Sequence, residues 1–586
     1  MINRMLAKNR SILGRLKTNE HTIMVVLAVI VGLAAGFGAV GFRHLIDFFQ
    51  SIAYGSSDEL LEVVQTIPWK IKIWIPALGG LIVGPLIFFF AREAKGHGVP
   101  EVMEAVALRG GIIRKRVVIV KSMASAISIS TGGSVGREGP IVQIGSAIGS
   151  ALGQALKVSA DRMRTLVGCG AAAGIAATFN APIAGSMFAL EVILGDFGLA
   201  TFSPIVISSV VATAVSRYFL GNMPAFDLPV YRLVSAWELP LYVILGFFCA
   251  AVAVTFTKVL YGAEDSFDRL RFPEYLKAVL GGLILGAMGL YVPHILGVGY
   301  PAMDLALMQE LSWGLMLGLV VAKIVATSIT IGSGGSGGVF APSLFMGAMA
   351  GGFFGTAVHH VFPAVTAPPP AYSIVGMGAV VAGTTHGPLS AIMILFEMTG
   401  EYKIILPLMI ACIISTLASG HLSKESIYTL KLARRGVNLE AGKEVNVLKS
   451  IRVKDVMNPS VETVPENLSL GRLADRIHKS KHKSFPVVAD NNHLTGMLSY
   501  FDYRDVIFDE NLKDLLVAQD LATEQVVTVP LDGDLYDALQ KITLKDYSLL
   551  PVVSPDDPTE LLGVLSRRDI ISAYNNAIMS KSMFEK

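Results

Sequence analysis

The residues most suggestive of chemistry are an arginine and a glutamate, Arg137 and Glu138, in the glycine-rich stretch GSVGREGP. This stretch, residues 133–140, separates the apolar runs VVIVKSMASAISIST and IVQIGSAIGSALG. Charged side chains within membrane segments are costly, and they pair with one another or mark an ion or proton pathway. The sequence therefore offers two interpretations of Glu138: an ion pair with Arg137, or a carboxylate that acts on a passing ion.

Three breaks in the chain share one pattern, in which glycines precede a proline at the beginning of an apolar helix. They are residues 96–100, 136–140 and 338–342. Proline costs nothing in the first turn of a helix, and glycine lets a ligand approach the backbone closely. Helix starts also have unpaired N–H groups and a partial positive charge, which favour an anion. Three starts that converge on one ion predict anion conduction, whereas a cation filter needs carbonyl or carboxylate rings.

The composition indicates the setting of these breaks. The chain has 586 residues, of which 52% are hydrophobic and 16% charged, as in a multi-pass protein of the lipid bilayer. Several apolar runs are shorter than the roughly 20 residues of a spanning helix, which predicts broken or re-entrant helices. A basic N-terminal segment before the first apolar run favours a cytoplasmic N-terminus. The net charge of +2 argues against a nucleic-acid partner.

The membrane part of the chain repeats itself. The stretch VKSMASAISISTGGSVGREGP aligns with AKIVATSITIGSGGSGGVFAP, and FNAPIAGSMFALE aligns with THGPLSAIMILFE. These alignments pair Lys121 with Lys323, Glu138 with Phe340, Pro140 with Pro342, Pro182 with Pro388 and Glu191 with Glu397. Internal repeats with paired glycine and proline interruptions are typical of secondary transporters and some channels, so the sequence predicts two related membrane halves.

The motifs GHGVPE, GREGP and GGVFAP, in this order, resemble those of the CLC family of chloride channels and transporters. The resemblance covers about residues 20–435. It implies an all-α membrane domain built as an inverted repeat with broken and re-entrant helices. It also implies a homodimer in which each subunit conducts chloride or a related anion.

The same resemblance assigns roles to particular residues. Glu138 would be the gating glutamate, whose carboxylate competes with chloride and moves aside when protonated, so external pH and chloride should both tune opening. Anion contacts would come from His97, Gly98, Val99, Val339, Phe340 and Tyr428. For Tyr428 the sequence alone leaves a second interpretation open, an interfacial aromatic anchor.

Two residues depart from the family pattern. His97 stands where the family usually has a serine that binds the anion; its imidazole either binds the anion or points away, which leaves the preference between chloride and nitrate open. Val192 stands where proton-coupled exchangers commonly have a second glutamate, directly after the position of Glu191. Because valine cannot relay a proton, the sequence favours a gated chloride channel over a chloride/proton antiporter. Glu191 itself is interpreted as a structural, hydrogen-bonded carboxylate.

Beyond about residue 435 the composition changes. A polar linker, residues 436–450, leads to a region in which FPVVADNNHLTGMLSYFDYRDV parallels LPVVSPDDPTELLGVLSRRDII. Each copy predicts strand, turn, strand and helix, and the pair resembles tandem α/β CBS domains at 451–508 and 518–576. The sequence is thus divided into a cytoplasmic segment 1–20, a membrane domain 21–435, the linker and two cytoplasmic CBS domains.

Each CBS copy has the element Gly-x-x-Ser-x-x-Asp. In adenine-nucleotide-binding CBS pairs its hydroxyl contacts phosphate and its aspartate contacts ribose. The residues concerned are Ser499, Asp502, Ser566 and Asp569. A serine at a helix start is equally a helix cap, so binding of ATP, ADP or AMP and a purely structural role both remain open. No other cofactor is implied.

Other classes of function fit the sequence less well. A CBS-regulated divalent-cation channel needs a carboxylate-lined pore, which these breaks do not provide. An enzyme with a phosphate-binding loop needs a lysine and a serine or threonine after the glycines, and they are absent after GSVGREGP. The three cysteines lie in apolar runs without metal-like spacing, so no metal site is predicted.

Overall fold

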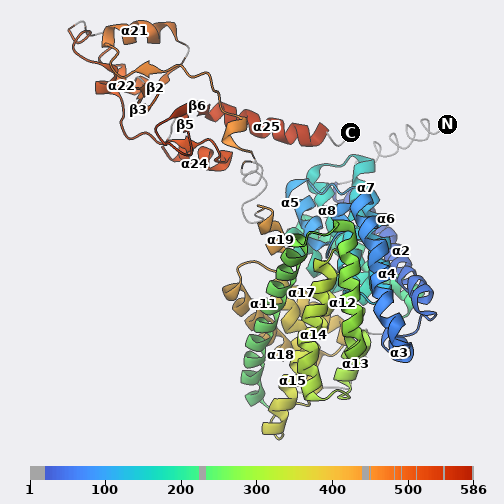
Figure 1. The fold of residues 1–586 in the computed structure, drawn as a ribbon. Coiled ribbons are helices and arrows are strands. Elements are labelled where there is room, and N and C mark those ends of the chain that lie inside the picture. Colours follow the sequence, from blue (N-terminus) through green and yellow to red (C-terminus); the bar gives the residue numbers. More distant parts are fainter. Residues whose placement is uncertain are drawn as a thin grey trace, which may run out of the picture. The chain divides into compact units, whose positions relative to one another are not determined.

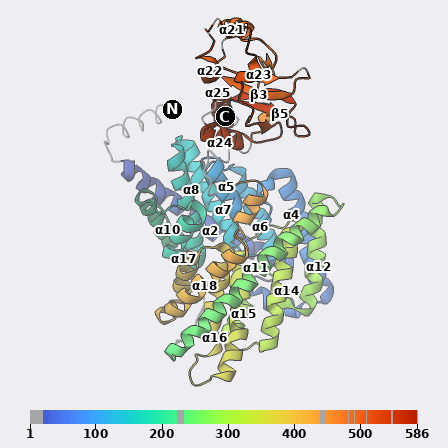
Figure 2. The same cartoon turned by 90° about the vertical axis from the view of Figure 1, so that its left-hand side faces the viewer.

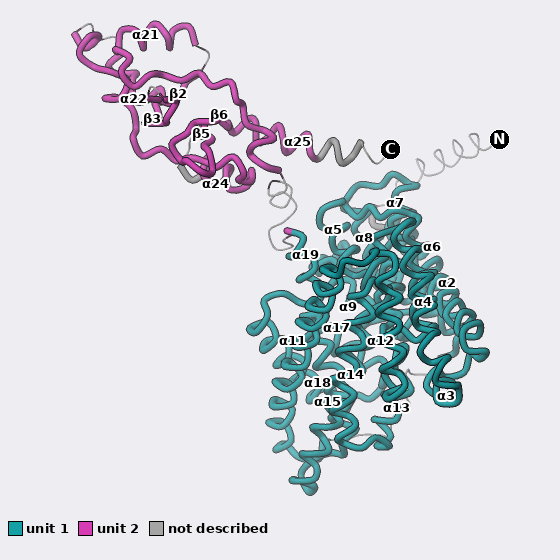
Figure 3. The backbone as a smooth tube through the Cα atoms, in the orientation of Figure 1, with its two compact units in different colours: residues 1–435 teal, residues 436–586 magenta. Residues whose placement is uncertain are grey.

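A computed structural model describes residues 20–222, 233–437, 448 and 451–583, apart from residues 481, 490, 508, 510 and 546–547. The chain forms two compact units, Met1–Arg435 and Gly436–Lys586, which are coloured separately in Figure 3. The predicted N-terminal segment 1–20 and linker 436–450 lie almost wholly outside the described residues, and they stay predictions.

Unit 1 is a bundle of helices (Figures 1 and 2). Its first half contains α2 (Glu20–Tyr54), α3 (Leu60–Thr66), α4 (Trp69–Phe90), α5 (Val99–Leu108), α6 (Arg116–Ser130), α7 (Glu138–Leu156), α8 (Ala160–Phe179), α9 (Pro182–Phe188) and α10 (Leu199–Leu220). Its second half contains α11 (Leu239–Arg269), α12 (Lys277–Tyr291), α13 (Tyr300–Leu307), α14 (Trp313–Gly332), α15 (Phe340–Val361), α16 (Pro369–Thr385), α17 (Pro388–Thr399), α18 (Ile405–Leu422) and α19 (Thr429–Arg434). Within the described ranges, 8 helices are long and apolar enough to cross a membrane.

The two halves pack in corresponding ways, as the repeat predicts. Helix α7 packs on α8 as α15 packs on α16, and α10 packs on α2 as α18 packs on α11. The short helices α5 and α13 occupy equivalent places, each before a longer pair. Helices α4 and α12, which also correspond, pack against each other and join the halves.

Glycine pairs explain why the equivalent helices come so close. A methyl group on Gly145 of α7 would lie 2.2 Å from the carbonyl oxygen of Gly170 on α8. In the other half, a methyl group on Gly347 of α15 would lie 2.3 Å from the carbonyl oxygen of Gly376 on α16. Small residues let membrane helices touch along their backbones, and here the same contact recurs in both halves.

Unit 2 contains two three-stranded sheets with the same topology. One has β1 (Val464–Pro465), β2 (Ser484–Val488) and β3 (Leu494–Ser499), and the other β4 (Val529–Pro530), β5 (Leu549–Val553) and β6 (Leu561–Ser566). In each, the first strand is parallel and the third antiparallel to the middle one. The helices are α21 (Leu470–Lys479), α22 (Tyr500–Tyr503), α23 (Ala518–Leu521), α24 (Leu535–Lys545) and α25 (Arg567–Met583).

The two copies of unit 2 exchange the segments that precede them in the sequence. Val453, at the beginning of the first copy, is buried in the core of the second, and the N–H of Asn458 donates to the carbonyl oxygen of Val564. Conversely, Ala518 is buried in the core of the first copy, and Thr523 exchanges backbone hydrogen bonds with Met497. Neither copy therefore completes its core without the other.

Candidate anion-binding site

The three glycine-rich breaks meet at one place in unit 1. Gly136 and Gly338 exchange backbone hydrogen bonds with N···O distances of 2.7 and 2.6 Å. Gly96 donates to the carbonyl oxygen of Gly335 at 3.1 Å and accepts from the N–H of Gly337 at 3.3 Å. Helices α5, α7 and α15 begin directly after these contacts. The convergence predicted from the sequence is thus present, and three helix starts share one junction.

Only glycine fits at the centre of this junction. A methyl group on Gly139 would lie 2.3 Å from the carbonyl oxygen of His97 and 2.9 Å from the Cα of Gly338. Gly98, which precedes α5, has a φ of +82°, a conformation that other residues rarely adopt. The glycines of the motifs therefore allow the backbones at the starts of α5, α7 and α15 to lie in direct contact.

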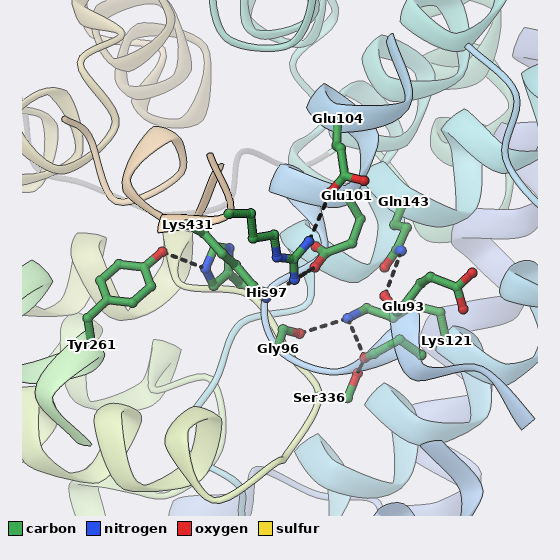
Figure 4. A network of polar contacts seen from close by, with 12 residues as sticks. Glu93, Gly96, His97, Glu101, Glu104, Lys121, Gln143, Tyr261, Ser336 and Lys431 are labelled. Atoms are coloured by element: carbon green, nitrogen blue, oxygen red, sulfur yellow. Dashed lines mark hydrogen bonds and ion pairs between the residues drawn. The ribbon is translucent and has the colours of Figure 1, made fainter. Parts of the chain in front are cut away.

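The matched lysines hold the breaks in place. Lys121 Nζ donates to the carbonyl oxygens of Ala94, at 3.0 Å, and Gly96, at 2.8 Å (Figure 4). Lys323 Nζ donates in the same way to the carbonyl oxygens of Ile295 and Gly297, both at 3.0 Å. Both lysines are fully buried. Carbonyl oxygens at these breaks thus accept hydrogen bonds from a buried lysine in each half.

Lys323 identifies a fourth break, residues 297–301, which sequence reasoning missed. Its sequence, GVGYP, has the same spacing as GHGVP at residues 96–100, so the signal was present. The N–H of Gly297 donates to the carbonyl oxygen of Gly132 at 3.1 Å, and helix α13 begins at Tyr300. All four breaks therefore belong to one hydrogen-bonded assembly.

Glu138, the first residue of α7, is buried in this assembly with 1% of its surface exposed. Its Oε1 accepts a hydrogen bond from the hydroxyl of Tyr300 at 3.2 Å, and its buried Oε2 has no hydrogen-bond partner. Oε2 folds back over Gly136, where a methyl group would lie only 2.2 Å from it. Among the described residues no ion pair joins Glu138 to Arg137, whose guanidinium carbon lies 5.3 Å from the centre of the Tyr300 ring.

The other candidate anion contacts lie close by. Val339 and Phe340 are buried at the start of α15, and the Phe340 ring packs against Phe179 with centroids 5.5 Å apart. Tyr428 is 1% exposed, and its ring centroid lies 5.6 Å from that of His97. Because Tyr428 is buried in protein, it is not an anchor at the lipid interface. The structure brings His97 and Tyr428 together.

The side chain of His97 is buried, and the hydrogen bonds around it indicate which ring nitrogen carries the proton. The hydroxyl of Tyr261 donates to the carbonyl oxygen of Ile427 at 2.6 Å, which uses its only proton. Its oxygen, 3.4 Å from His97 Nε2 (Figure 4), can then only accept, so the neutral ring has its proton on Nε2. Nδ1 is a buried acceptor without a partner. In this arrangement, Nδ1 can donate to an anion only after it takes up a proton.

Ion pairs fasten the two elements that carry His97 and Tyr428. Glu101 of α5 pairs with Lys431 of α19 at 3.1 Å and with Arg435 at 3.3 Å, and Arg435 also pairs with Glu104 at 2.9 Å. Figure 4 shows this network beside His97. The Glu101–Lys431 pair is nearly buried, with 9% of each side chain exposed, so removing either partner would leave an unpaired charge between α5 and α19.

Glu191 and Glu397, paired by the repeat, make equivalent contacts in opposite halves. Glu191 accepts from the N–H groups of Leu389 at 3.1 Å and Ser390 at 2.7 Å, at the start of α17. Glu397 accepts from the N–H groups of Ile183 at 3.1 Å and Ala184 at 2.7 Å, at the start of α9. Each carboxylate thus caps a helix of the other half, as the structural interpretation of Glu191 requires.

Glu191→Gln is expected to lower the thermal unfolding temperature without changing the pH dependence of anion flux. The neutral amide loses charge-assisted hydrogen bonds to a helix start, which we expect to cost about 2 kcal/mol. Differential scanning fluorimetry of the detergent-solubilised protein measures the shift, with Glu397→Gln as the symmetric variant and the exposed Glu310→Gln as control. A normal melting temperature combined with an altered pH dependence would instead assign Glu191 to proton transfer.

The candidate nucleotide residues of unit 2 are engaged with one another. In the first copy, the N–H and hydroxyl of Ser499 each donate to Asp502 Oδ2 at 2.6 Å. In the second copy, the N–H and hydroxyl of Ser566 donate to Asp569 Oδ2 at 3.0 and 2.6 Å. These pairs cap α22 and α25, which is the structural alternative considered for this element.

Comparison with known proteins agrees with this architecture. Residues 79–420 match the sequence profile of the family described as "Voltage gated chloride channel", and residues 453–509 and 517–576 each match that of the "CBS domain". The chain is 37% identical over 415 residues to "Putative chloride channel protein ClcB-like" of Ralstonia nicotianae, covering 70% of this chain and 97% of that protein. It is 30% identical over 469 residues to "H(+)/Cl(-) exchange transporter ClcA" of Yersinia pestis, covering 78% of this chain and 95% of that protein.

Among solved structures, a slow cyanobacterial Cl−/H+ antiporter is similar with a TM-score of 0.65 and 28% identity, over 72% of this chain and 99% of that one. The fold class expected from the sequence, an all-α membrane domain followed by an α/β CBS pair, is confirmed. The chain belongs to the CLC family of chloride channels and transporters, and it is a multi-pass anion-transport membrane protein with a C-terminal pair of CBS domains.

Proposed function

We propose that the protein is a gated chloride channel in which Glu138 is the gate. The observation that carries this proposal is the buried carboxylate of Glu138 at the junction where α5, α7 and α15 begin. Helix starts favour anions, so this side chain occupies a position suited to chloride. An ionised Glu138 excludes chloride from that position, and protonation removes the competing charge and frees the pathway.

The proposed anion contacts continue inward from the gate. Backbone N–H groups of Val339 and Phe340 begin α15, and those of Gly98 and Val99 begin α5. His97 and Tyr428 then lie at the inner side of the same pathway. Neutral His97 presents the lone pair of Nδ1 there, so in this state Nδ1 donates no hydrogen bond to an anion at this position.

The residues at position 192 and next to it favour a passive channel over an exchanger. This residue is apolar and 8% exposed, and the neighbouring Glu191 is committed to capping α17. Neither side chain is suited to relay protons. The second candidate is a chloride/proton antiporter, which relatives named as exchangers favour. We place the N-terminus and the CBS domains on the cytoplasmic side in either case.

The two candidates predict different reversal potentials. With the protein in liposomes or a planar bilayer, and with chloride and pH gradients varied independently, a passive channel reverses at the chloride equilibrium potential at every pH gradient. An antiporter reverses elsewhere, because its electrical driving force includes the proton gradient. Any shift of the reversal potential with the pH gradient, at a fixed chloride gradient, excludes the channel and establishes the antiporter.

We also propose that the CBS pair binds an adenine nucleotide through Ser499, Asp502, Ser566 and Asp569. Both copies have the complete element, and Arg567 and Arg568 follow the second serine. Binding at 100 times the dissociation constant stabilises a protein by about 2.7 kcal/mol, so ATP, ADP or AMP should raise the melting temperature of the full-length protein.

Substitutions of the aspartates separate binding from capping. Asp502→Asn and Asp569→Asn should abolish the nucleotide-induced shift. The matched control is Asp520→Asn, because Asp520 caps α23 by accepting from the N–H of Val517 at 2.9 Å but lies outside the nucleotide element. If none of the three nucleotides shifts the wild-type melting temperature, the element has a structural role only.

A further inference from the structure

The fourth break places a tyrosine from the second half of unit 1 against the gate of the first half. Tyr300 begins α13, after Gly299 with a φ of +98°. Its hydroxyl donates to Glu138 Oε1 at 3.2 Å. In the repeat, the spacing of GVGYP and GHGVP sets Tyr300 opposite Val99. The first half has the glutamate and the second half the tyrosine, so each occurs once and the two meet across the junction.

Tyr300 is held independently of Glu138. Its ring lies under the guanidinium of Arg137, 5.3 Å from centroid to carbon, and α13 packs against α15. Lys323 fixes the backbone of the break through the carbonyl oxygen of Gly297. A donor held in this way can stay in place while the glutamate side chain moves.

The hydroxyl of Tyr300 is the side-chain group that donates a hydrogen bond to the carboxylate of Glu138. The charged and titratable groups that act on Glu138 are Arg137, Tyr300 and Tyr428, and Arg43 of α2 lies beyond Arg137 and Tyr300. Within the described part of the chain, Tyr300 makes the one side-chain hydrogen bond to the carboxylate. Such a bond is strong when the acceptor is charged and weak when it is neutral.

We propose that Tyr300 is a latch on the gate: its hydroxyl holds the ionised Glu138 in the closed position and loses most of that hold when Glu138 is protonated. This inference depends on the proposed gating role of Glu138. Tyr300 is a positioning residue, since it acts on the anion pathway through Glu138. The hydroxyl favours the closed position of Glu138 only while the carboxylate is charged. This stabilisation of the closed position must therefore weaken as the pH falls.

Tyr300→Phe tests the latch because it removes the hydroxyl and keeps the ring under Arg137. At pH 7.5, where the proposed gate is ionised in the wild type, the latch predicts that chloride flux into liposomes rises about tenfold, the factor that corresponds to one hydrogen bond to a charged group. At pH 4.5 the variant and wild type should conduct equally. The pH of half-maximal flux should rise by about one unit, because the ionised gate has lost a stabilising donor.

Three comparisons keep the test specific. Tyr291→Phe removes the hydroxyl of an 88% exposed tyrosine and should behave as wild type. Tyr300→Leu also lacks the hydroxyl and should show the same pH-dependent gain. The double variant Tyr300→Phe/Glu138→Gln should conduct like Glu138→Gln alone, since a latch without a charged gate has nothing to hold.

The outcomes distinguish failure of the latch from failure of the gate. If Glu138→Gln conducts like wild type at every pH, the gating role itself is wrong. If Glu138→Gln opens the pathway but Tyr300→Phe matches wild type at pH 7.5, the gate stands and the latch is overturned. A gain in Tyr300→Phe that is equal at both pH values, or that adds to Glu138→Gln, also overturns it, because it shows an effect on the pore that bypasses the gate.

Discussion

Glu138→Gln is expected to raise chloride flux at pH 7.5 by at least tenfold and to remove its dependence on pH. Glutamine has nearly the shape of protonated glutamic acid, so the variant represents the released gate at every pH. The wild-type carboxylate competes with chloride while it is ionised, and acid removes that competition. Flux through the wild type should therefore rise as pH falls and meet that of the variant at low pH.

Chloride efflux from liposomes at a series of external pH values measures both effects. The control is Glu310→Gln, which neutralises an exposed carboxylate of the same unit and should leave the pH profile unchanged. Size-exclusion chromatography confirms that each variant is assembled. Flux that is unchanged in both size and pH dependence would show that Glu138 is not the gate and would return it to a structural role.

The junction of the breaks illustrates what local sequence patterns can predict. Glycine followed by proline marks a helix start whatever surrounds it, because the cause is backbone geometry and the missing N–H of proline. The repeat then relates the starts in the two halves. These two signals sufficed to predict that the breaks converge, and the backbone hydrogen bonds between Gly136 and Gly338 agree.

Contacts between distant side chains were not predictable in the same way. The sequence aligned Lys121 with Lys323 and Glu191 with Glu397, but it identified the hydrogen-bond partners of neither pair. The structure identifies them: the lysines donate to carbonyl oxygens of the breaks, and the glutamates cap helices of the opposite half. The glutamates cap helix starts about 200 residues away, whereas the lysines reach carbonyl oxygens 25–28 residues away. Both sets of partners depend on how the helices pack, which no local pattern records.

The CBS pair shows a third case, in which the elements were foreseen but their assembly was not. Strand, turn, strand and helix follow from alternation and turn residues in each copy. That Val453 completes the core of the second copy and Ala518 that of the first depends on which buried surface each segment reaches. Sequence order alone would have assigned each segment to the copy that follows it.

Replacing Gly139 by alanine is expected to reduce chloride flux by as large a factor as Glu138→Gln is expected to raise it. Gly139→Ala would place a methyl group 2.3 Å from the carbonyl oxygen of His97 and 2.9 Å from the Cα of Gly338. Both neighbours are backbone atoms, so no side chain can rotate away. The three helix starts must separate, which breaks the paired hydrogen bonds of Gly136 and Gly338.

Chloride flux through Gly139→Ala should therefore fall at least tenfold, and the melting temperature should drop as expected for overpacking of about 1–3 kcal/mol. Gly318→Ala on α14 is the matched control, because its methyl group meets no atom within 4 Å, and alanine favours a helix by about 1 kcal/mol over glycine. It should conduct normally and melt slightly higher. Normal flux through an assembled Gly139→Ala would mean that chloride does not pass the junction of the three helix starts, because a pathway there could not survive their separation.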